Sequence, residues 1–304
     1  MELLCPILGR VTRVRPTAFR SGEWQVVRCE ETGFVFLANP PSYEALTSEH
    51  AWEVTSAAEK ERRKSAEPML SKLSLAAARL KLRLFPRRNR FFTLAERQCV
   101  VLPDDRPIRI LDIGCAAADL LQDLQGRFAA IGRGIIPLGI EVSAHLARLA
   151  HETCAGMGGR VVFANAVDGA GQFGAESVDL VIMSSFLEHE AQPLVLLRKL
   201  HRVLSENGTV VLKVPNFACV NRVLRGGRWC GFRYPDHVNY FTPATLRRLA
   251  AESGFEVLQG WLDCLPTSDT MYAVLRKSGV SKSARGSDVS AGSEAAVLSH
   301  RRAA

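Results

Sequence analysis

The segment from residue 110 to residue 121 most constrains the fold of this chain. It reads as a buried strand (Ile110–Ile113), a turn of small residues (Gly114–Ala118) and the first residues of a helix. Because a strand that turns directly into a helix brings backbone N–H groups close to a ligand, the side chains at the turn have to be small. The segment therefore indicates a site for a nucleotide-like cofactor. A small-residue helix start that packs on a sheet without any ligand has the same pattern.

Backbone conformation limits which residues this turn can contain. Gly114 can adopt positive φ at no cost, whereas alanine in such a conformation costs on the order of 1 kcal/mol. Ala116 and Ala118 occupy the next small positions of the turn. We therefore predict that both alanines have negative φ.

Strand patterns and helix patterns alternate along residues 108–214, which favours a parallel sheet with helices on both faces. Strands are predicted at residues 108–113, 136–141, 160–164, 178–183 and 209–214. Helices are predicted near residues 119–130, 143–155 and 191–204, with Asn207-Gly208 as the stop of the last one. Residues 255–259 and 271–276 are expected to pair as an antiparallel hairpin at the sheet edge.

Several spaced motifs are shared with a known family. Residues 112–118 match Asp-Ile-Gly-Cys-Gly-x-Gly except for alanine at 116 and 118, residues 139–143 match Gly-x-Glu-x-Ser, and residues 185–189 read Ser-Phe-Leu-Glu-His. Further matches are Pro193, Leu197, Leu200–Leu204, Gly208, Val214–Asn216, Pro235–Thr242 and Leu246–Phe255. On these residues the chain resembles the class I S-adenosylmethionine-dependent methyltransferases, in the group related to the ubiquinone-pathway O-methyltransferases. The resemblance covers residues 108–259 well and the N-terminal residues loosely.

The resemblance implies an α/β fold with a Rossmann-like, doubly wound, mostly parallel seven-stranded sheet and an antiparallel edge hairpin. A small β-rich N-terminal subdomain and linker helices precede that sheet. The expected boundaries are residues 1–48 for the β subdomain, 49–100 for linker or lid helices, 101–277 for the cofactor-binding domain with a substrate cap at 217–242, and 278–304 for a disordered tail. Within the linker, residues 85–97 are expected to form part of a lid or a plain strut between domains.

The resemblance also implies S-adenosylmethionine as the cofactor. Glu141 ends the second strand, where its carboxylate can accept hydrogen bonds from both ribose hydroxyls. Alternatively, Glu141 is a structural residue next to a helix N-cap and binds no ligand. Asn165 and Ala166 follow the third strand. In the family this position presents a polar group and a backbone N–H to adenine, but an ordinary surface loop would have the same sequence. The predicted cofactor-binding residues are Asp112, Gly114, Cys115, Ala116, Glu141, Val142, Asn165, Ala166, Met183 and Ser184.

His189 and His237 are the candidate catalytic residues. Methyl transfer is an in-line displacement in which the enzyme aligns the nucleophile and removes at most one proton. An imidazole near its ordinary pKa can accept that proton close to neutral pH. A histidine at a strand end can instead orient a loop by hydrogen bonding. Glu188 is expected to orient His189 or a helix end, and no metal ligand set is predicted.

Arginine and aromatic residues alternate in residues 217–240, between the fifth strand and the closing helix. The substrate candidates are Arg228, Trp229, Arg233 and Tyr234. Guanidinium groups beside aromatic rings suit an anionic or ring-bearing acceptor, for example a phosphorylated one. A solvated cap loop anchored by a tryptophan has the same composition.

The N-terminal residues resemble a zinc-ribbon-like leader that has lost half of its thiolates. Cys5 and Cys29 remain, whereas Leu8 and Thr32 occupy the positions of the other two ligands. Because structural zinc needs four ligands, we predict no zinc there and a ribbon shape kept by packing. If the purified protein contained stoichiometric zinc, this prediction would be wrong.

Composition narrows the class of protein further. The 304 residues include 47% hydrophobic ones, but no apolar run approaches the roughly 20 residues that span a bilayer. The net charge of +8 comes from residues 79–90 and 276–304, so nucleic acid is disfavoured as a partner. Eight dispersed cysteines without a Cys-x-x-Cys pair are typical of small buried hydrophobic residues. We expect a cytoplasmic protein that does not act at a membrane.

The sequence therefore predicts a methyltransferase that acts on a small-molecule acceptor. The two alanines in the turn and the lost thiolates leave open a degenerate methyltransferase fold that binds a ligand or partner without turnover. A nicotinamide-dependent dehydrogenase is disfavoured because the turn lacks Gly-x-Gly-x-x-Gly spacing. A ribosomal RNA methyltransferase is disfavoured because the globular remainder is not basic. The acceptor atom, the substrate and the oligomeric state stay open.

Overall fold

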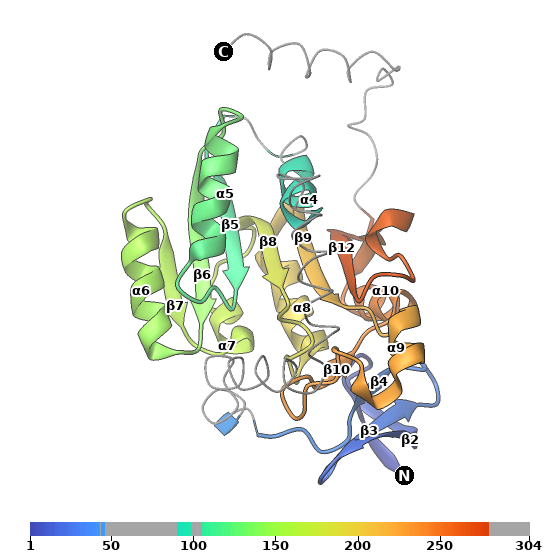
Figure 1. Cartoon of the computed structure of the whole chain (residues 1–304). Coiled ribbons are helices and arrows are strands. Elements are labelled where there is room, and N and C mark those ends of the chain that lie inside the picture. Colours follow the sequence, from blue (N-terminus) through green and yellow to red (C-terminus); the bar gives the residue numbers. More distant parts are fainter. Residues whose placement is uncertain (43, 46–89, 99–101, 103–104, 280–304) are drawn as a thin grey trace, which may run out of the picture.

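The computed structural model describes residues 1–42, 44–45, 90–98, 102 and 105–279 (Figure 1). Most of the predicted linker helices and the predicted C-terminal tail lie outside these described residues. Within them, none of the helices combines the length and apolar character needed to cross a membrane.

The larger sheet of the described chain has seven strands in the order β11-β12-β9-β8-β5-β6-β7. Its strands are β5 (Ile108–Ile113), β6 (Ile135–Glu141), β7 (Arg160–Phe163), β8 (Val178–Ser184), β9 (Leu204–Pro215), β11 (Phe255–Leu258) and β12 (Thr270–Lys277). Strands β5 to β9 pair in parallel, whereas β12 is antiparallel to both β9 and β11. The predicted α/β fold, its mostly parallel sheet and its edge hairpin are confirmed.

Helices cover both faces of this sheet, because the central strands are apolar on both sides. One core cluster joins the sheet to α4 (Arg90–Gln98), α5 (Asp119–Ala129) and α6 (Ala144–Ala155). A second cluster on the other face joins it to α7 (Ala166–Gly171), α8 (Pro193–Val203) and α10 (Pro243–Glu252). Figure 1 shows this layered arrangement, with α5 and α8 on opposite sides of the strands.

The end of α8 differs from the sequence prediction. The helix ends at Val203, and the following strand already begins at Leu204 and runs through the Asn207-Gly208 dipeptide that was predicted to stop the helix. Leu204 has an extended backbone, is fully buried and pairs with Val178 of β8. Burial of this leucine in the sheet outweighs the local turn preference of Asn-Gly.

Helix α4 is the described part of the predicted lid or strut. Its apolar side chains, including Phe91 and Leu94, are buried in the core cluster that covers the sheet. Arg90 forms an ion pair of 2.6 Å with Asp263, and Glu96 accepts a hydrogen bond of 2.9 Å from Arg127 of α5. The helix therefore packs on a sheet face.

A smaller antiparallel sheet has the order β1-β2-β3-β4-β10. Its strands are β1 (Glu2–Cys5), β2 (Arg10–Ser21), β3 (Trp24–Cys29), β4 (Val35–Leu37) and β10 (Asn239–Tyr240). The β-rich N-terminal part that the sequence predicted is confirmed as strands β1 to β4, whereas their pairing with β10 was not predicted. Because β10 pairs with β4, the N-terminal residues share a sheet with a segment more than 200 positions later in the chain.

The substrate-cap segment packs against this small sheet. It contains α9 (Val220–Arg225) and the short helix η2 (Gly226–Arg228), and a further short helix, η3 (Trp261–Asp263), precedes β12. An aromatic cluster joins cap and sheet through Phe19, Phe217, Trp229, Phe232 and Tyr240. Burial of these rings fixes the residues that follow them, including His237.

Candidate functional site

The turn after β5 lies at the carboxyl end of the parallel strands, where open α/β sheets bind ligands. The amides of Gly114 and Cys115 both donate to the carbonyl of Ile140 on the neighbouring strand, over 2.9 and 3.1 Å. Gly114 has a φ of 71°, and a Cβ at this position would lie 2.7 Å from the Phe186 ring. Only glycine therefore fits between the turn and the loop after β8.

The prediction of negative φ for the two alanines is wrong. Ala116 has a φ of 48° and Ala118 a φ of 71°, so both lie in the left-handed region. The hydrogen bonds of the turn impose this conformation: the amide of Ala116 donates to Glu141 over 2.9 Å, and that of Ala118 donates to the carbonyl of Cys115 over 2.8 Å. The Ala118 side chain is fully buried in the core cluster beneath the turn.

Glu141 is the last residue of β6 and is 7% exposed. Its carboxylate accepts three backbone N–H groups, each over 2.9 Å: Val142 and Ser143 donate to Oε1, and Ala116 donates to Oε2. These bonds connect the turn after β5 to the turn after β6. A carboxylate has about four acceptor positions, so Oε2 retains one for a further donor.

Asp112 and Cys115 lie beneath the turn. Burial, together with the charge of Glu141, raises the pKa of Asp112 well above its usual range. Burial also raises the pKa of the Cys115 thiol, so it is protonated and unreactive near neutral pH. A Cβ at Gly139 would lie 2.6 Å from the Cys115 sulfur, which shows how closely the thiol packs against β6.

The remaining predicted cofactor residues lie along the same sheet edge. Asn165 is the N-cap of α7 and accepts a hydrogen bond of 2.9 Å from the amide of Asp168. Ala166 begins α7 and is buried. Met183 is fully buried in β8, whereas Ser184 ends that strand and is half-buried. The edge thus collects residues from the ends of four neighbouring strands.

His189 is held by an acidic residue that the sequence did not assign. Its Nδ1 donates to the carboxylate Oδ1 and to the backbone carbonyl of Asp236, over 2.9 Å each. Arg233 in turn forms an ion pair of 2.6 Å with the same carboxylate. Burial lowers the pKa of His189, but the hydrogen bond and charge of Asp236 outweigh that effect and raise it. Asp236, and not Glu188, therefore orients His189.

His237 lies beside His189 in a drier environment. It is 5% exposed, and its Nδ1 donates to the carbonyl of Gly231 over 2.8 Å. The two imidazole rings meet edge to face with their centroids 4.6 Å apart. Burial, assisted by the neighbouring His189, lowers the pKa of His237 well below its usual range. His237 is therefore neutral near pH 7, and its Nε2 carries a lone pair.

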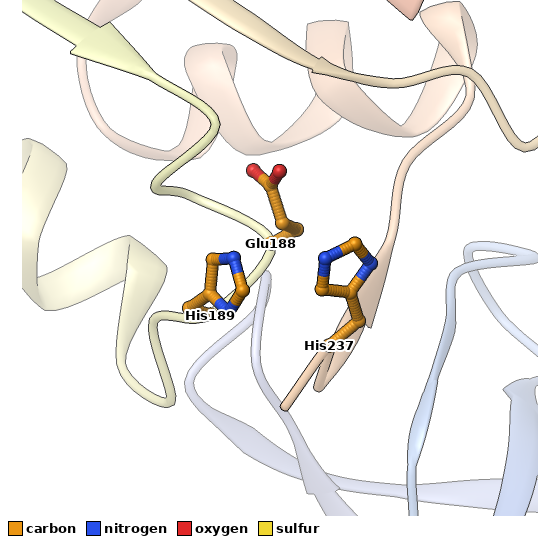
Figure 2. A group of neighbouring side chains, drawn as sticks. All are labelled: Glu188, His189 and His237. Carbon is orange, nitrogen blue, oxygen red and sulfur yellow. The ribbon is translucent and has the colours of Figure 1, made fainter. Parts of the chain in front are cut away.

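Glu188 completes a cluster with the two histidines, and Figure 2 shows the three side chains next to one another. Each offers one ligand atom, and these atoms lie within 4.8 Å of one another. Glu188 is 1% exposed, its Oε2 has no hydrogen-bond partner within the described part of the chain, and burial raises its pKa. The backbone of the same residue is fixed, since its carbonyl accepts from the amides of Val238 and Asn239.

The four substrate candidates have different surroundings. Arg228 is exposed at the end of η2, whereas Trp229 is 2% exposed and donates its indole N–H to Asp269 over 2.7 Å. Arg233 contacts Asp236, and Tyr234 stacks on Phe232 within the aromatic cluster. Trp229 thus serves as an anchor of the cap, and Arg228 alone of the four projects into solvent.

Sequence reasoning missed Asp236, the Gly231 carbonyl and Asn239. The Asn239 amide donates to the carbonyls of Leu187 and Glu190, over 3.1 and 2.6 Å, and so joins the two loops that supply the histidines. The signal available was the segment Asp236-His237-Val238-Asn239, which is polar although it adjoins a buried strand. Its partners lie about 50 residues earlier, beyond any local pattern.

A family model described as a methyltransferase domain matches residues 74–260. No curated protein sequence matches the chain. One similar solved structure is an S-adenosylmethionine-dependent methyltransferase from Mesorhizobium loti, which is 18% identical in sequence. The match covers 60% of this chain and 96% of that chain, with a TM-score of 0.46. Another from Clostridium acetobutylicum has 10% identity, covers 68% and 99%, and has a TM-score of 0.48.

Proposed function

This chain belongs to the methyltransferase-domain family, and on that basis we propose that it transfers a methyl group to an oxygen, nitrogen or carbon nucleophile of a small molecule. S-adenosylmethionine is its cofactor, and when bound it supplies a methyl group on a positively charged sulfur. The proposed place of transfer is the carboxyl edge of the larger sheet, between the turn after β5 and the loop after β8.

The observation that carries the proposal is the position of the Glu141 carboxylate. It is fixed by three backbone donors, and Oε2 has room for one more, which fits a ribose hydroxyl. The proposed sites for the rest of the cofactor are the Gly114–Ala116 turn, Val142, the Asn165–Ala166 corner and the Met183–Ser184 strand end. The Ala118 methyl group packs into the core and therefore does not compete for the same space.

His189 and His237 are the proposed proton acceptors. The Nδ1 atoms of both rings donate to protein oxygens, so both rings present Nε2 as the group that can accept a proton. Of the two, His237 has the lowered pKa and is ready to accept at neutral pH. His189 is oriented by Asp236, which also stabilises its charged form.

The composition of the cap segment supports a proposal for the acceptor class. We propose an anionic or ring-bearing small molecule, with Arg228 and Tyr234 as the contact residues nearest the cap surface. The grouping with ubiquinone-pathway O-methyltransferases rests on the Leu-Glu-His and Asp-His-Val-Asn-Tyr segments of the sequence. The seven described cysteines are all free thiols, in keeping with the proposed cytoplasmic location.

The degenerate zinc ribbon is proposed for the first part of the chain. The turn after Cys5 and the turn after Cys29 each close with an amide that donates to the cysteine carbonyl, from Gly9 and Gly33 respectively, over 2.9 Å. Both cysteines are fully buried, and their thiols interact with each other. Two loops of this shape with only two thiols are consistent with a ribbon that keeps its form by packing.

Calorimetric titration with S-adenosylhomocysteine tests the proposal. Wild-type protein is expected to bind with micromolar affinity, and Glu141→Ala to weaken binding by roughly 10-fold to 100-fold, the value of one hydrogen bond to a charged group. Glu152→Ala removes an exposed carboxylate from α6 and serves as the matched control. Far-UV circular dichroism checks that both variants are folded.

A second function is favoured by one observation. Ala116 and Ala118 are in the left-handed conformation at positions where the family motif has glycines. A protein of this fold that no longer catalyses methyl transfer can tolerate such strained substitutions in its cofactor turn. The chain would then bind a ligand or partner without methyl transfer. Absence of heat with S-adenosylhomocysteine for folded wild-type protein would favour this function over the enzyme.

A further inference from the structure

We propose that Glu188, His189 and His237 bind one divalent first-row transition-metal ion. The three ligand atoms converge from two loops that are far apart in sequence but adjacent in space (Figure 2). Two imidazoles and one carboxylate form a ligand set that zinc, iron and manganese accept. The sequence did not predict this site because His237 follows the other two residues by about 50 positions.

Hydrogen bonds already fix the tautomer that metal binding needs. The Nδ1 of His237 donates to the Gly231 carbonyl, and the Nδ1 of His189 donates to Asp236. Both rings therefore carry their proton on Nδ1 and leave Nε2 with a lone pair for a metal ion. A carboxylate or backbone carbonyl behind each ligating histidine is the usual arrangement around protein-bound metals.

The buried carboxylate of Glu188 is the second observation that indicates a cation at this place. Its side chain is 1% exposed, and its Oε2 is a buried oxygen without a hydrogen-bond partner among the described residues. Leaving such an atom unpaired in the protein interior is unfavourable, and more so if it is charged. A cation between Glu188 and the two Nε2 atoms satisfies the oxygen and offsets that cost.

The separations suit an ion after a small closure. Ligand atoms about 2.1 Å from a metal lie about 3.4 Å apart in a tetrahedral site. Because the present atoms lie within 4.8 Å of one another, the widest pair has to approach by about 1.4 Å. Rotation about the Glu188 side-chain bonds supplies movement of this size. The side chain of His189 is 21% exposed, so the site opens on that side.

The role of the ion rests on the proposed function, although its binding does not. Three protein ligands leave a position for an oxygen of the acceptor on the open side. With the ion bound, the two Nε2 atoms are ligands and no longer accept a proton, so the ion takes over that task. A divalent ion lowers the pKa of a hydroxyl bound to it, the hydroxyl proton leaves to water, and the oxygen becomes the nucleophile. The acceptor class is then a hydroxyl compound that can approach from the His189 side.

Cobalt(II) is the probe for the test. Full-length protein is stripped with a chelator and titrated with Co²⁺, with visible d–d absorption and equilibrium dialysis as the readouts. We expect one equivalent to bind to wild-type protein, and both Glu188→Gln and His237→Gln to weaken binding by at least about 10-fold. A double variant of His145 and His151, two exposed histidines on α6, is the matched control and should bind as wild type does.

Three outcomes overturn the metal site. The first is absence of Co²⁺ binding to folded wild-type protein, which does not depend on any variant. The second is binding that survives in folded Glu188→Gln and His237→Gln. The third is an intense thiolate-to-cobalt band, which places the ion at cysteine thiolates and not at the two histidines. S-adenosylhomocysteine titration of the same samples keeps the two proposals separate: cofactor binding without metal overturns only the metal site, and metal binding without cofactor overturns only the methyltransferase.

Discussion

Replacing Ala116 by glycine should stabilise the protein, although alanine-to-glycine changes usually destabilise. Ala116 has a φ of 48°, a conformation in which an L-residue other than glycine is strained. Its amide donates to Glu141, so the turn cannot relax to negative φ without losing that bond. The substitution removes the strain and leaves the hydrogen bond in place.

The magnitude follows from three effects. Relief of the left-handed conformation contributes about 1–2 kcal/mol, whereas the greater freedom of glycine in the unfolded chain costs about 0.4–1 kcal/mol. The Ala116 methyl group is only half-buried, so little hydrophobic burial is lost. The expected gain is therefore about 0.5–1 kcal/mol. At Ala118, which is fully buried, loss of the methyl group costs about 0.8 kcal/mol more, so Ala118→Gly should be close to neutral.

Urea unfolding followed by circular dichroism measures these differences, since the midpoint moves with the free energy of unfolding when the slope is unchanged. The control is Ala251→Gly, at an exposed position of helix α10, which should lose about 0.5–1 kcal/mol. If Ala116→Gly destabilised the protein as much as this control does, the left-handed turn and the reasoning from it would be refuted.

Two further predictions concern the opposite edge of the sheet and the packing under the turn. Asp179 is 1% exposed and accepts from Arg106 and Arg109, which hold its pKa far below the usual value, although its burial acts the other way. The stabilisation from this carboxylate is therefore fully present above about pH 4, the pKa of aspartate in the unfolded chain, and is lost as the pH falls from there toward the lower pKa of the folded protein. Asp179→Asn should lower the free energy of unfolding by about 2–3 kcal/mol at pH 7, and the difference from wild type should shrink in acid. Urea unfolding between pH 7 and pH 2 measures this difference. A wild-type curve parallel to that of the variant would contradict this assignment. Gly139→Ala places a Cβ 2.6 Å from the Cys115 sulfur and should destabilise by about 1–3 kcal/mol, with weakened S-adenosylhomocysteine binding; unchanged stability would show that the thiol moves freely.

Much of the larger sheet was predictable because its signals are local. The strand at residues 108–113 and the hairpin near the C-terminal end appear where apolar runs and turn residues indicated them. The error at the end of α8 has a physical cause: burial of Leu204 in the sheet is a tertiary effect, and the Asn-Gly preference that misled the prediction is a local one.

The site was predictable only in part. Motifs placed Glu141 at the end of a strand and His189 just after one, and the structure has Glu141 as the last residue of β6 and His189 in the loop after β8. No motif indicated Asp236 as the partner of His189, because Asp236 lies 47 residues further along the chain and contacts His189 only through tertiary packing. Backbone strain at Ala116 was likewise beyond sequence reasoning, since the hydrogen bond that imposes it comes from a different strand.

The pairing of β4 with β10 links the position of His237 to the sequence of the N-terminal hairpins. Phe36 pairs with Asn239, two positions after His237, so the N-terminal hairpins act as a scaffold for the second histidine. Substitutions in those hairpins can shift that ring without altering a single residue at the sheet edge. Removal of these hairpins would therefore take away the backbone pairing that supports the second imidazole.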